Sequence, residues 1–216
     1  MFAHIPKAAG SSVYLWFLDD GWLISNLGLQ ESAGIGLDLK EKFNILQCQI
    51  EGPLSNESSV QHSVVSTYRQ WGDFTSGFCI VRHPWSRFVS EIRYAFTLAC
   101  EQSSVSNPTE SIAMRFIQDY MLKVFNAFPE CKNIRDNHIR PQTDFISEIT
   151  EVYYLERDWK EQLQAKYDLK GLPPTANKTV LPFDFEPLLD DNIRNMVLDF
   201  YHEDFELLDY EKTIPK

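Results

Sequence analysis

The feature that most constrains the fold of this chain is an unbroken apolar run, Phe78–Val81, followed by a turn and a helical pattern. An apolar run of this length is typical of a strand buried on both faces, as in parallel sheets. Arg82–Pro84 forms the turn, and Ser86 is placed to cap the helix whose apolar residues then recur at helical spacing to residue 99. The pattern predicts a strand, a tight turn and a helix in succession.

The amino terminus repeats this pattern. Phe2–Ile5 predicts a short strand, Pro6–Ser12 a loop of small residues, and residues 13–20 a helix that stops at Gly21. Two such units predict an α/β fold in which a central parallel sheet is flanked by helices. The 216 residues contain no internal repeat or linker, so we expect a single domain over residues 1–216.

Further elements are expected along the chain. A strand is predicted at Asn44–Gln49, an amphipathic helix at Ser111–Phe128, a late strand at Val152–Leu155 and a last helix at Asn192–Tyr201. The loop that begins at Pro173 is polar in its middle, and loops of this kind in compact domains often act as lids.

Composition limits the class of partner. The formal net charge of −11 argues against nucleic acid or an anionic membrane as the main partner, and the acidic last third predicts a solvated surface. No run approaches the ~18 consecutive apolar residues of a membrane span. Phe2–Ile5 leads straight into a Pro-Lys turn without the basic start of a signal peptide. These features predict a cytoplasmic protein.

The four cysteines do not form a metal-binding pattern. Cys48, Cys79, Cys100 and Cys131 are widely spaced and include no C-x-x-C pair, which argues against a zinc site. Cys79 lies within an apolar run and is expected to be a buried thiol. A disulfide among the other three stays open.

The first motif with chemical potential is the small-residue loop at residues 6–12. Backbone N–H groups at a strand-to-helix loop bind anions, and the helix N-terminus and Lys7 add positive charge. Ser11 and Ser12 supply hydroxyl donors. The lysine precedes Gly10, so the loop is not a Walker A motif. The alternative is an ordinary turn with a solvent-exposed lysine.

The second motif begins at Arg82, where the buried strand ends. Ligands collect at the carboxyl ends of the strands in open α/β sheets. Arginine donates a planar fork of hydrogen bonds to phosphate, and Ser90 would add a hydroxyl from the following helix. The alternative is that Arg82 and Arg87 pair with surface carboxylates.

Together these motifs resemble the carbohydrate (family 2) branch of the sulfotransferases that use 3′-phosphoadenosine 5′-phosphosulfate (PAPS). Residues 5–12 resemble that family's P-K-T-G-G-T-S or P-K-T-A-S-T-S loop, and residues 82–90 resemble its V-R-[DN]-P-x-x-R-x-x-S motif. Gln61–Ser63 resembles its H-A-T segment, His138–Gln142 its H-x-x-P-Q segment, and Tyr201–Tyr210 its Y-x-x-D-x-x-L-F-G-Y terminus. The resemblance implies a P-loop-like sulfotransferase fold.

The resemblance also implies a donor site without a metal, which releases adenosine 3′,5′-bisphosphate (PAP). The donor-binding residues that it implies are Lys7, Ala8, Ala9, Gly10, Ser11, Ser12, Arg82, Ser90, Lys178 and Thr179. The last two belong to a loop that closes over the nucleotide in the resembling enzymes. Ala8 and Ala9 depart from the family's usual residues and remove a hydroxyl, and His83 stands where Asp or Asn is usual.

Sulfuryl transfer needs in-line positioning, a cation at the leaving oxygen and a base for the acceptor hydroxyl. Lys7 is the expected cation. A histidine that titrates near neutrality suits the base, and His62 is the first choice with His138 second. Glu91 is a further carboxylate that the sequence does not place. His4 and His202 are expected to be structural, and His83 no more than a neighbour of the donor.

Other functions remain open at the level of sequence. The resemblance implies a carbohydrate hydroxyl as acceptor, and a Golgi luminal domain whose anchor has been removed as an alternative to the cytoplasm. A P-loop-type nucleotide kinase is the rival enzyme, although the lysine is misplaced for it. A non-catalytic relative that binds nucleotide is the third possibility. The sequence gives no sign of the oligomeric state.

Overall fold

The computed structural model describes residues 1–22, 24, 62–68, 75–176 and 179–215. Within these ranges the chain is an α/β protein with a three-stranded parallel sheet in the order β1 (Phe2–Ala3), β2 (Gly77–Val81) and β3 (Thr150–Tyr154). The predicted parallel sheet flanked by helices is thereby confirmed. The strand expected at Asn44–Gln49 lies outside the described residues.

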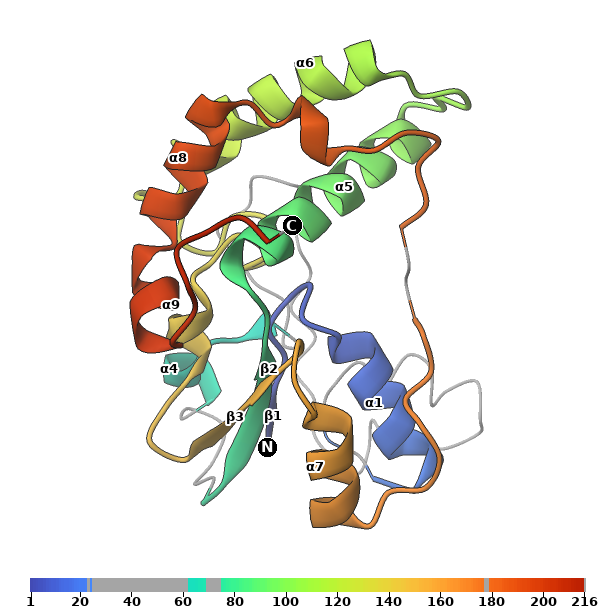
Figure 1. The fold of residues 1–216 in the computed structure, drawn as a ribbon, viewed down its shortest axis with the longest axis vertical. Helices are drawn as coiled ribbons and strands as arrows, with labels where there is room; N and C mark the ends of the chain where they lie inside the picture. Colours follow the sequence, from blue (N-terminus) through green and yellow to red (C-terminus); the bar gives the residue numbers. More distant parts are fainter. Residues whose placement is uncertain (23, 25–61, 69–74, 177–178, 216) are drawn as a thin grey trace.

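Helices surround this small sheet (Figure 1). Those labelled in the figure are α1 (Gly10–Asp19), α4 (Val65–Tyr68), α5 (Pro84–Gln102), α6 (Glu110–Tyr120), α7 (Trp159–Tyr167), α8 (Asp191–Phe200) and α9 (His202–Leu207). A π-helical turn, η3 (Met121–Phe125), extends α6, and the short 3₁₀ turns are η4 (Gln142–Phe145) and η5 (Glu186–Leu188). Figure 1 shows α1 and α7 beside the sheet, and α5 rising from the end of β2 to pass beneath α6.

Both faces of the sheet are buried, as the unbroken apolar run predicts. On one face Phe2 and Phe78 pack with residues of α1 and α7, and on the other Ala3 and Cys79 pack with Phe145. Burial raises the pKa of the Cys79 thiol to about 12, so this thiol is inert at neutral pH. The three described cysteines are free thiols, and Cys48 lies outside the described residues.

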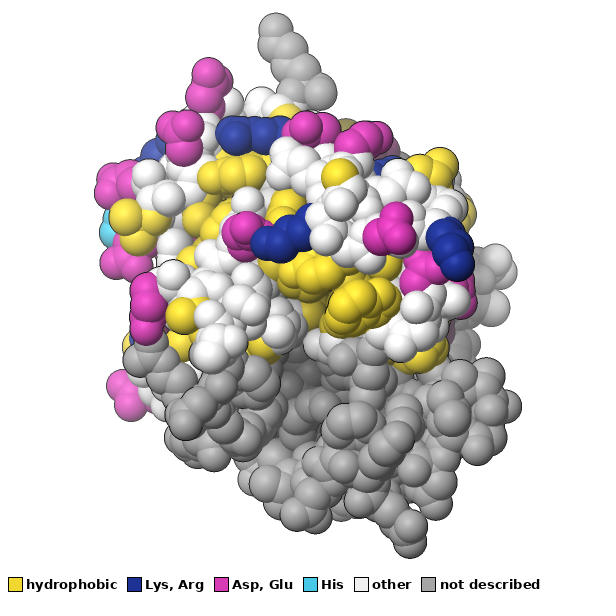
Figure 2. Space-filling model, turned by 90° about the horizontal axis from the view of Figure 1, so that it is seen from below, with side chains coloured by type: hydrophobic (Ala, Val, Ile, Leu, Met, Phe, Trp, Pro, Cys, Tyr) yellow, Lys and Arg dark blue, Asp and Glu magenta, His cyan; other side chains and the backbone are white. Residues whose placement is uncertain are grey.

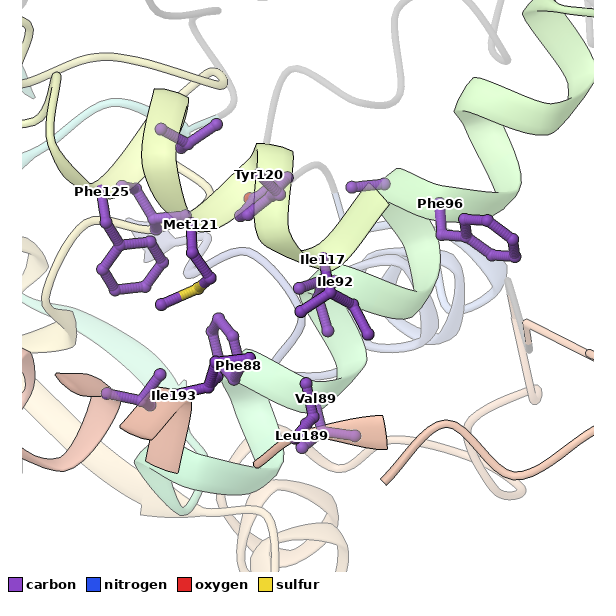
Figure 3. Packing of buried hydrophobic residues seen from close by; sticks show 14 of the residues in the cluster. Phe88, Val89, Ile92, Phe96, Ile117, Tyr120, Met121, Phe125, Leu189 and Ile193 are labelled. Atoms are coloured by element: carbon purple, nitrogen blue, oxygen red, sulfur yellow. The ribbon is translucent and has the colours of Figure 1, made fainter. Parts of the chain in front are cut away.

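The long helix α5 carries the centre of the larger core. Phe88 and Ile92 on α5 lie against Ile117 of α6, Met121 of η3 and Ile193 of α8 (Figure 3). The burial of an apolar stripe on each helix agrees with the predicted helical spacing. Two positions that the spacing assigned to the apolar side, Ile112 and Met196, are exposed instead, because no element covers that part of α6 and α8 within the described residues.

Two predicted boundaries are wrong. Ser86 does not cap α5, because the helix begins at Pro84 and His83 holds the cap position. Proline suits the first helical position, where its missing N–H would have had no intrahelical partner. Helix α1 begins at Gly10, so Ser11 and Ser12 lie in its first turn and not in the preceding loop.

Two of the segments that resemble the sulfotransferase pattern, His138–Gln142 and Tyr201–Tyr210, contact each other and fix the backbone of Arg82. The buried carboxylate of Asp204 accepts the backbone N–H groups of Gln142 (2.9 Å) and Thr143 (3.1 Å). The Gln142 amide in turn accepts from the Arg82 N–H (2.9 Å) and donates to its carbonyl (2.8 Å). Unpaired buried amides cost about 1–3 kcal/mol each, so this network stabilises one backbone position for Arg82.

Arg87 is buried, so the alternative of pairing with a surface carboxylate does not describe it. Its guanidinium donates to the carbonyls of His138 (3.0 Å) and Arg140 (2.7 Å), and it lies 5.0 Å from the ring centre of Tyr201. The arginine therefore holds the His138 segment against α5.

The acidic last third is largely solvated. The exposed members are Asp184, Asp190, Asp191, Glu203, Glu206, Asp209 and Glu211, whereas Glu186 is half-buried and Asp204 is buried. Figure 2 shows one face of the molecule, where hydrophobic side chains gather in the middle and acidic ones lie around them. No helix in the described part of the chain has the length and apolar character needed to span a membrane.

Candidate functional site

A cavity of about 780 Å³ lies at the carboxyl ends of the strands and brings the two sequence motifs together. The expected site residues that line it are Lys7, Ala9, Gly10, Ser11, Ser12, His62, Arg82, Ser90, His138 and Thr179. Ala8 is buried and does not line it. Lys178 lies outside the described residues. Open α/β sheets place their ligands at this edge because parallel strands all end there.

The loop after β1 has the backbone shape of an anion-binding turn. Lys7 (φ 65°) and Ala9 (φ 63°) are left-handed, and Ala9 immediately precedes the first residue of α1. Alternating backbone conformations of this kind form a concave set of N–H groups, and the helix end adds its dipole. Neither left-handed residue is glycine, so the loop stores about 1–3 kcal/mol of strain at each, which is common at binding sites.

The two motifs are in direct contact. The Arg82 guanidinium donates from Nη1 to the carbonyl oxygen of Lys7 at 3.3 Å, across 75 residues of sequence. None of the carboxylates in the described ranges forms an ion pair with Arg82. Burial lowers the pKa of Arg82, Glu156 opposes this, and the charges of Arg87 and Arg93 lower it further. Arginine charges gathered without an ion-pair partner favour an anion.

The Lys7 side chain is half-buried and lines the cavity. Its Nζ is 4.0 Å from the ring centre of Tyr94 on α5. Burial lowers the pKa of Lys7, while the negative charge of Glu91 opposes that effect. The alternative of an ordinary turn with a solvated lysine therefore does not describe this loop.

The proline-flanked loop reaches the first turn of α1. The Ala176 N–H donates to Oγ of Ser12 at 3.3 Å, and Thr175 and Thr179 also line the cavity. The described part of this loop has no regular structure, as the sequence predicts. Its contact is made at Ala176, two residues before Lys178, the first of the two loop residues that the resemblance indicated.

Two histidine–carboxylate pairs lie side by side at the cavity. Nδ1 of His62 is 2.7 Å from Asp136, and Nδ1 of His138 is 2.6 Å from Glu91. The two imidazole rings are 4.9 Å apart edge to face, and the ring of His4 lies 4.8 Å from that of His62. Because each Nδ1 is bonded to a carboxylate, Nε2 of each ring is left to exchange a proton with a ligand.

The same cluster is a poor tetrahedral metal site. The possible ligand atoms of His62, Asp136 and His138 lie within 4.8 Å of one another. Ligands around a tetrahedral zinc ion are about 3.4 Å apart, given zinc–nitrogen bonds of about 2.1 Å. Asp136 is moreover already engaged with His62. The geometry fits two hydrogen-bonded acid–base pairs better than one cation site.

Sequence reasoning missed several polar residues at this cavity and left Glu91 unplaced. Arg93 and Tyr94 lie three and four positions after Ser90, so helical periodicity puts them on the same face of α5 and could have identified them. Asp136 had no such signal. It lies in a turn where residues 135–137 are all left-handed without a glycine, and where buried Asn137 donates to the His62 carbonyl. Thr175 was also missed.

The buried histidines predict an acid-sensitive fold. Burial lowers the pKa of His4 well below 6.5, reinforced by His62, His138 and Lys7, and burial lowers that of His62 although Asp136 opposes it. As the pH falls through 6.5, the unfolded chain therefore binds more protons at these histidines than the folded chain does. The stability that the neutral histidines contribute is present above this pH and is lost below it. Each unit of pKa depression corresponds to about 1.4 kcal/mol.

We expect the thermal midpoint to fall by several degrees between about pH 7.5 and about pH 5.5, since 1 kcal/mol shifts it by about 2–4 °C in a chain of this size. Carboxylates such as Glu91, whose pKa lies below 4.5, do not titrate in this window. His202→Asn provides the control, because this exposed histidine lies outside the cluster of buried histidines and does not line the cavity. A flat midpoint over this range would contradict the buried, neutral state of His4 and His62.

The fold and cavity define an α/β protein in which a lysine after β1, an arginine after β2 and two histidine–carboxylate pairs meet at one cavity. No protein-family model, curated protein or solved structure matches this chain. Its function is therefore inferred from its own residues and geometry.

Proposed function

We propose that this protein is a PAPS-dependent sulfotransferase with a P-loop-like sulfotransferase fold. The observation that carries the proposal is that the Lys7 loop and the Arg82–Ser90 pair, 75 residues apart, touch each other and line one cavity. A donor with phosphate groups on both the 3′ and the 5′ oxygen of one ribose needs two such anion sites close together. A volume of about 780 Å³ is in the range of ligand pockets, which hold about 300–1,000 Å³.

The 5′-phosphosulfate and the 3′-phosphate of the proposed donor would each be held by a separate set of residues. The loop amides, Ser11 and Ser12 would hold the 5′-phosphosulfate at the N-terminus of α1. Arg82 and Ser90 would hold the 3′-phosphate, and Arg93 supports this assignment as a second cation one turn beyond Ser90.

The reaction would be an in-line displacement at sulfur. The acceptor oxygen forms a bond to sulfur while the bond between sulfur and the bridging phosphate oxygen breaks, and that oxygen keeps the electron pair. Lys7 stabilises the charge that develops on it. A histidine, His62 or His138, takes the acceptor proton. The scheme requires no metal.

The acceptor is proposed to be a carbohydrate hydroxyl, in line with the resemblance. The strongly acidic surface favours a neutral acceptor over a sulfated polymer. We place the enzyme in the cytoplasm, with the Golgi lumen as the alternative compartment.

Calorimetry with adenosine 3′,5′-bisphosphate tests the donor site. We expect binding in the presence of a chelator, and a loss of about 10-fold or more in affinity on Arg82→Ala, because a charge-assisted hydrogen bond contributes about 1.5–3 kcal/mol. Arg157→Ala is the matched control, since Arg157 stacks 3.9 Å from Tyr154 and does not line the cavity.

The rival functions are outcomes of the same experiment. If the protein binds ATP in the presence of magnesium and does not bind the bisphosphate, the result would favour a nucleotide kinase over the proposed sulfotransferase. Binding of the bisphosphate without transfer of labelled sulfate to any member of a panel of glycans and small alcohols would favour the non-catalytic relative.

A further inference from the structure

The two histidine–carboxylate pairs differ in how well each could support a positive charge. The carboxylate of Glu91 has a side chain only 1% exposed, and it is tied by His138 at 2.6 Å, by the Tyr120 hydroxyl at 3.1 Å and by Arg135 at 3.6 Å. Burial alone would raise the pKa of Glu91, but His138, Arg135 and Lys7 together lower it below its usual 4.5. Glu91 is therefore an ionised carboxylate with a fixed orientation, directly behind His138.

His62 lacks these advantages. Its side chain is 7% exposed, against 13% for His138, and its ring is enclosed edge to face by those of His4 and His138. Burial lowers the pKa of His62 despite its bond to Asp136. A proton arriving at His62 would place a charge beside two further imidazoles, and Asp136 would be the carboxylate bonded to it.

His138 is also better connected to the donor loop. The His138 ring stacks on the Tyr94 ring, with the ring centres 5.6 Å apart and an interplanar angle of 24°. The Lys7 ammonium contacts the Tyr94 ring as well, 4.0 Å from its centre. Tyr94 thus sets the position of His138 relative to the cation at the leaving oxygen. Rigid placement of both groups is what an in-line displacement requires.

We propose that His138 is the general base of this site and that Glu91 is the residue that positions it and balances its charge. The inference rests on the proposed sulfotransferase function and reverses the order in which the sequence ranked the two histidines. As the acceptor oxygen bonds to sulfur, its proton passes to Nε2 of His138. Glu91 accepts the Nδ1–H throughout, holds one tautomer and stabilises the imidazolium that forms, as carboxylates do in other acid–base pairs.

The kinetic test measures transfer of labelled sulfate from PAPS to lactose, N-acetyllactosamine and chitobiose. His138→Gln should lower kcat by about 100- to 10,000-fold, the usual contribution of a general base. Glu91→Gln should lower kcat by about 100-fold and change the donor KM by less than about 3-fold, because it disturbs the base and not the phosphate contacts. His62→Gln should cost at least about 10-fold less than His138→Gln.

Exposed residues of the same types provide matched controls. His202→Gln and Glu203→Gln should leave kcat within about 2-fold of the unchanged protein, since neither side chain reaches the cavity. A larger loss for His62→Gln than for His138→Gln would overturn the inference while leaving the proposed transferase intact.

A spectroscopic test does not depend on turnover. In protein labelled at its histidines, the strongly bonded Nδ1–H of His138 should give a downfield proton resonance that disappears in His138→Gln, moves upfield in Glu91→Gln and persists in His62→Gln. Loss of that resonance in His62→Gln alone, with bisphosphate binding unchanged, would refute the His138–Glu91 pair. If the bisphosphate does not bind while the resonance behaves as expected, the transferase function fails and the pair alone stands.

Discussion

Replacement of Lys7 by alanine is expected to lower the kcat for sulfuryl transfer by about 100- to 1,000-fold, the usual cost of removing one preorganised group that stabilises transition-state charge. The ammonium is held in the cavity over Tyr94, 4.0 Å from its ring centre. Alanine adopts the left-handed conformation at residue 7 (φ 65°) about as readily as lysine does, so the loop should keep its shape. Initial rates with labelled donor measure the loss, and the thermal midpoint reports on folding.

Lys132→Ala is the matched control for this change. Lys132 also holds its ammonium over an aromatic ring, 4.4 Å from the centre of Phe128, but it does not line the cavity. The loss of a cation–π contact is thus common to both variants, and the loss of the cavity charge is specific to Lys7→Ala. If the kcat of Lys7→Ala stays within about 3-fold of that of the unchanged protein, this lysine does not stabilise the transition state.

Gly10→Ala is expected to destabilise the fold and to weaken donor binding together. An added Cβ at residue 10 would lie 1.8 Å from Nε2 and 2.0 Å from Cδ2 of His4. The His4 ring has little room to move, because it stacks on Phe2 at 5.7 Å and meets His62 at 4.8 Å. Overpacking of this kind costs about 1–3 kcal/mol or more, so the midpoint should fall by several degrees. The affinity for the bisphosphate should fall as well, because Gly10 begins α1 at the donor loop.

A double-mutant cycle separates this clash from other effects of the substitution. His4→Ala removes the ring that Gly10 accommodates, so His4→Ala with Gly10→Ala should cost less than the sum of the two single changes. If the losses of stability from the two single changes are strictly additive, the clash with His4 is not the reason that Gly10→Ala is destabilising. An unchanged midpoint for Gly10→Ala would mean that His4 does not pack against this turn.

The local units of this fold were predictable because each depends on neighbouring residues. The apolar run after Gly77 predicts a strand buried on both faces, and the strand, loop and helix order predicts parallel pairing. The predicted cap failed because the chain had a locally equivalent option, and Pro84 starts α5 in place of a serine cap. The role of Arg87, which the sequence left open, was decided by its inward turn to donate to two carbonyls. Single positions of this kind depend on packing that a local pattern does not contain.

The donor half of the candidate site was predictable for the same reason. Lys7 and Arg82 each follow a strand, and parallel strands end at one edge, so their meeting in one cavity follows from topology. Ala9 in a left-handed conformation was not foreseen, because glycine is the residue that normally marks such a turn.

By itself, therefore, the sequence determined the α/β class, the loops that follow the first two strands and the residue types that line the cavity. Only the tertiary structure decided which acid stands behind which histidine. His62 and Asp136 are 74 residues apart and Glu91 and His138 are 47 apart, and neither pair belongs to a repeating pattern. Hydrogen bonds across such distances depend on the direction of side chains set by the packing of α5 and the left-handed turn at 135–137, so no local propensity encodes them.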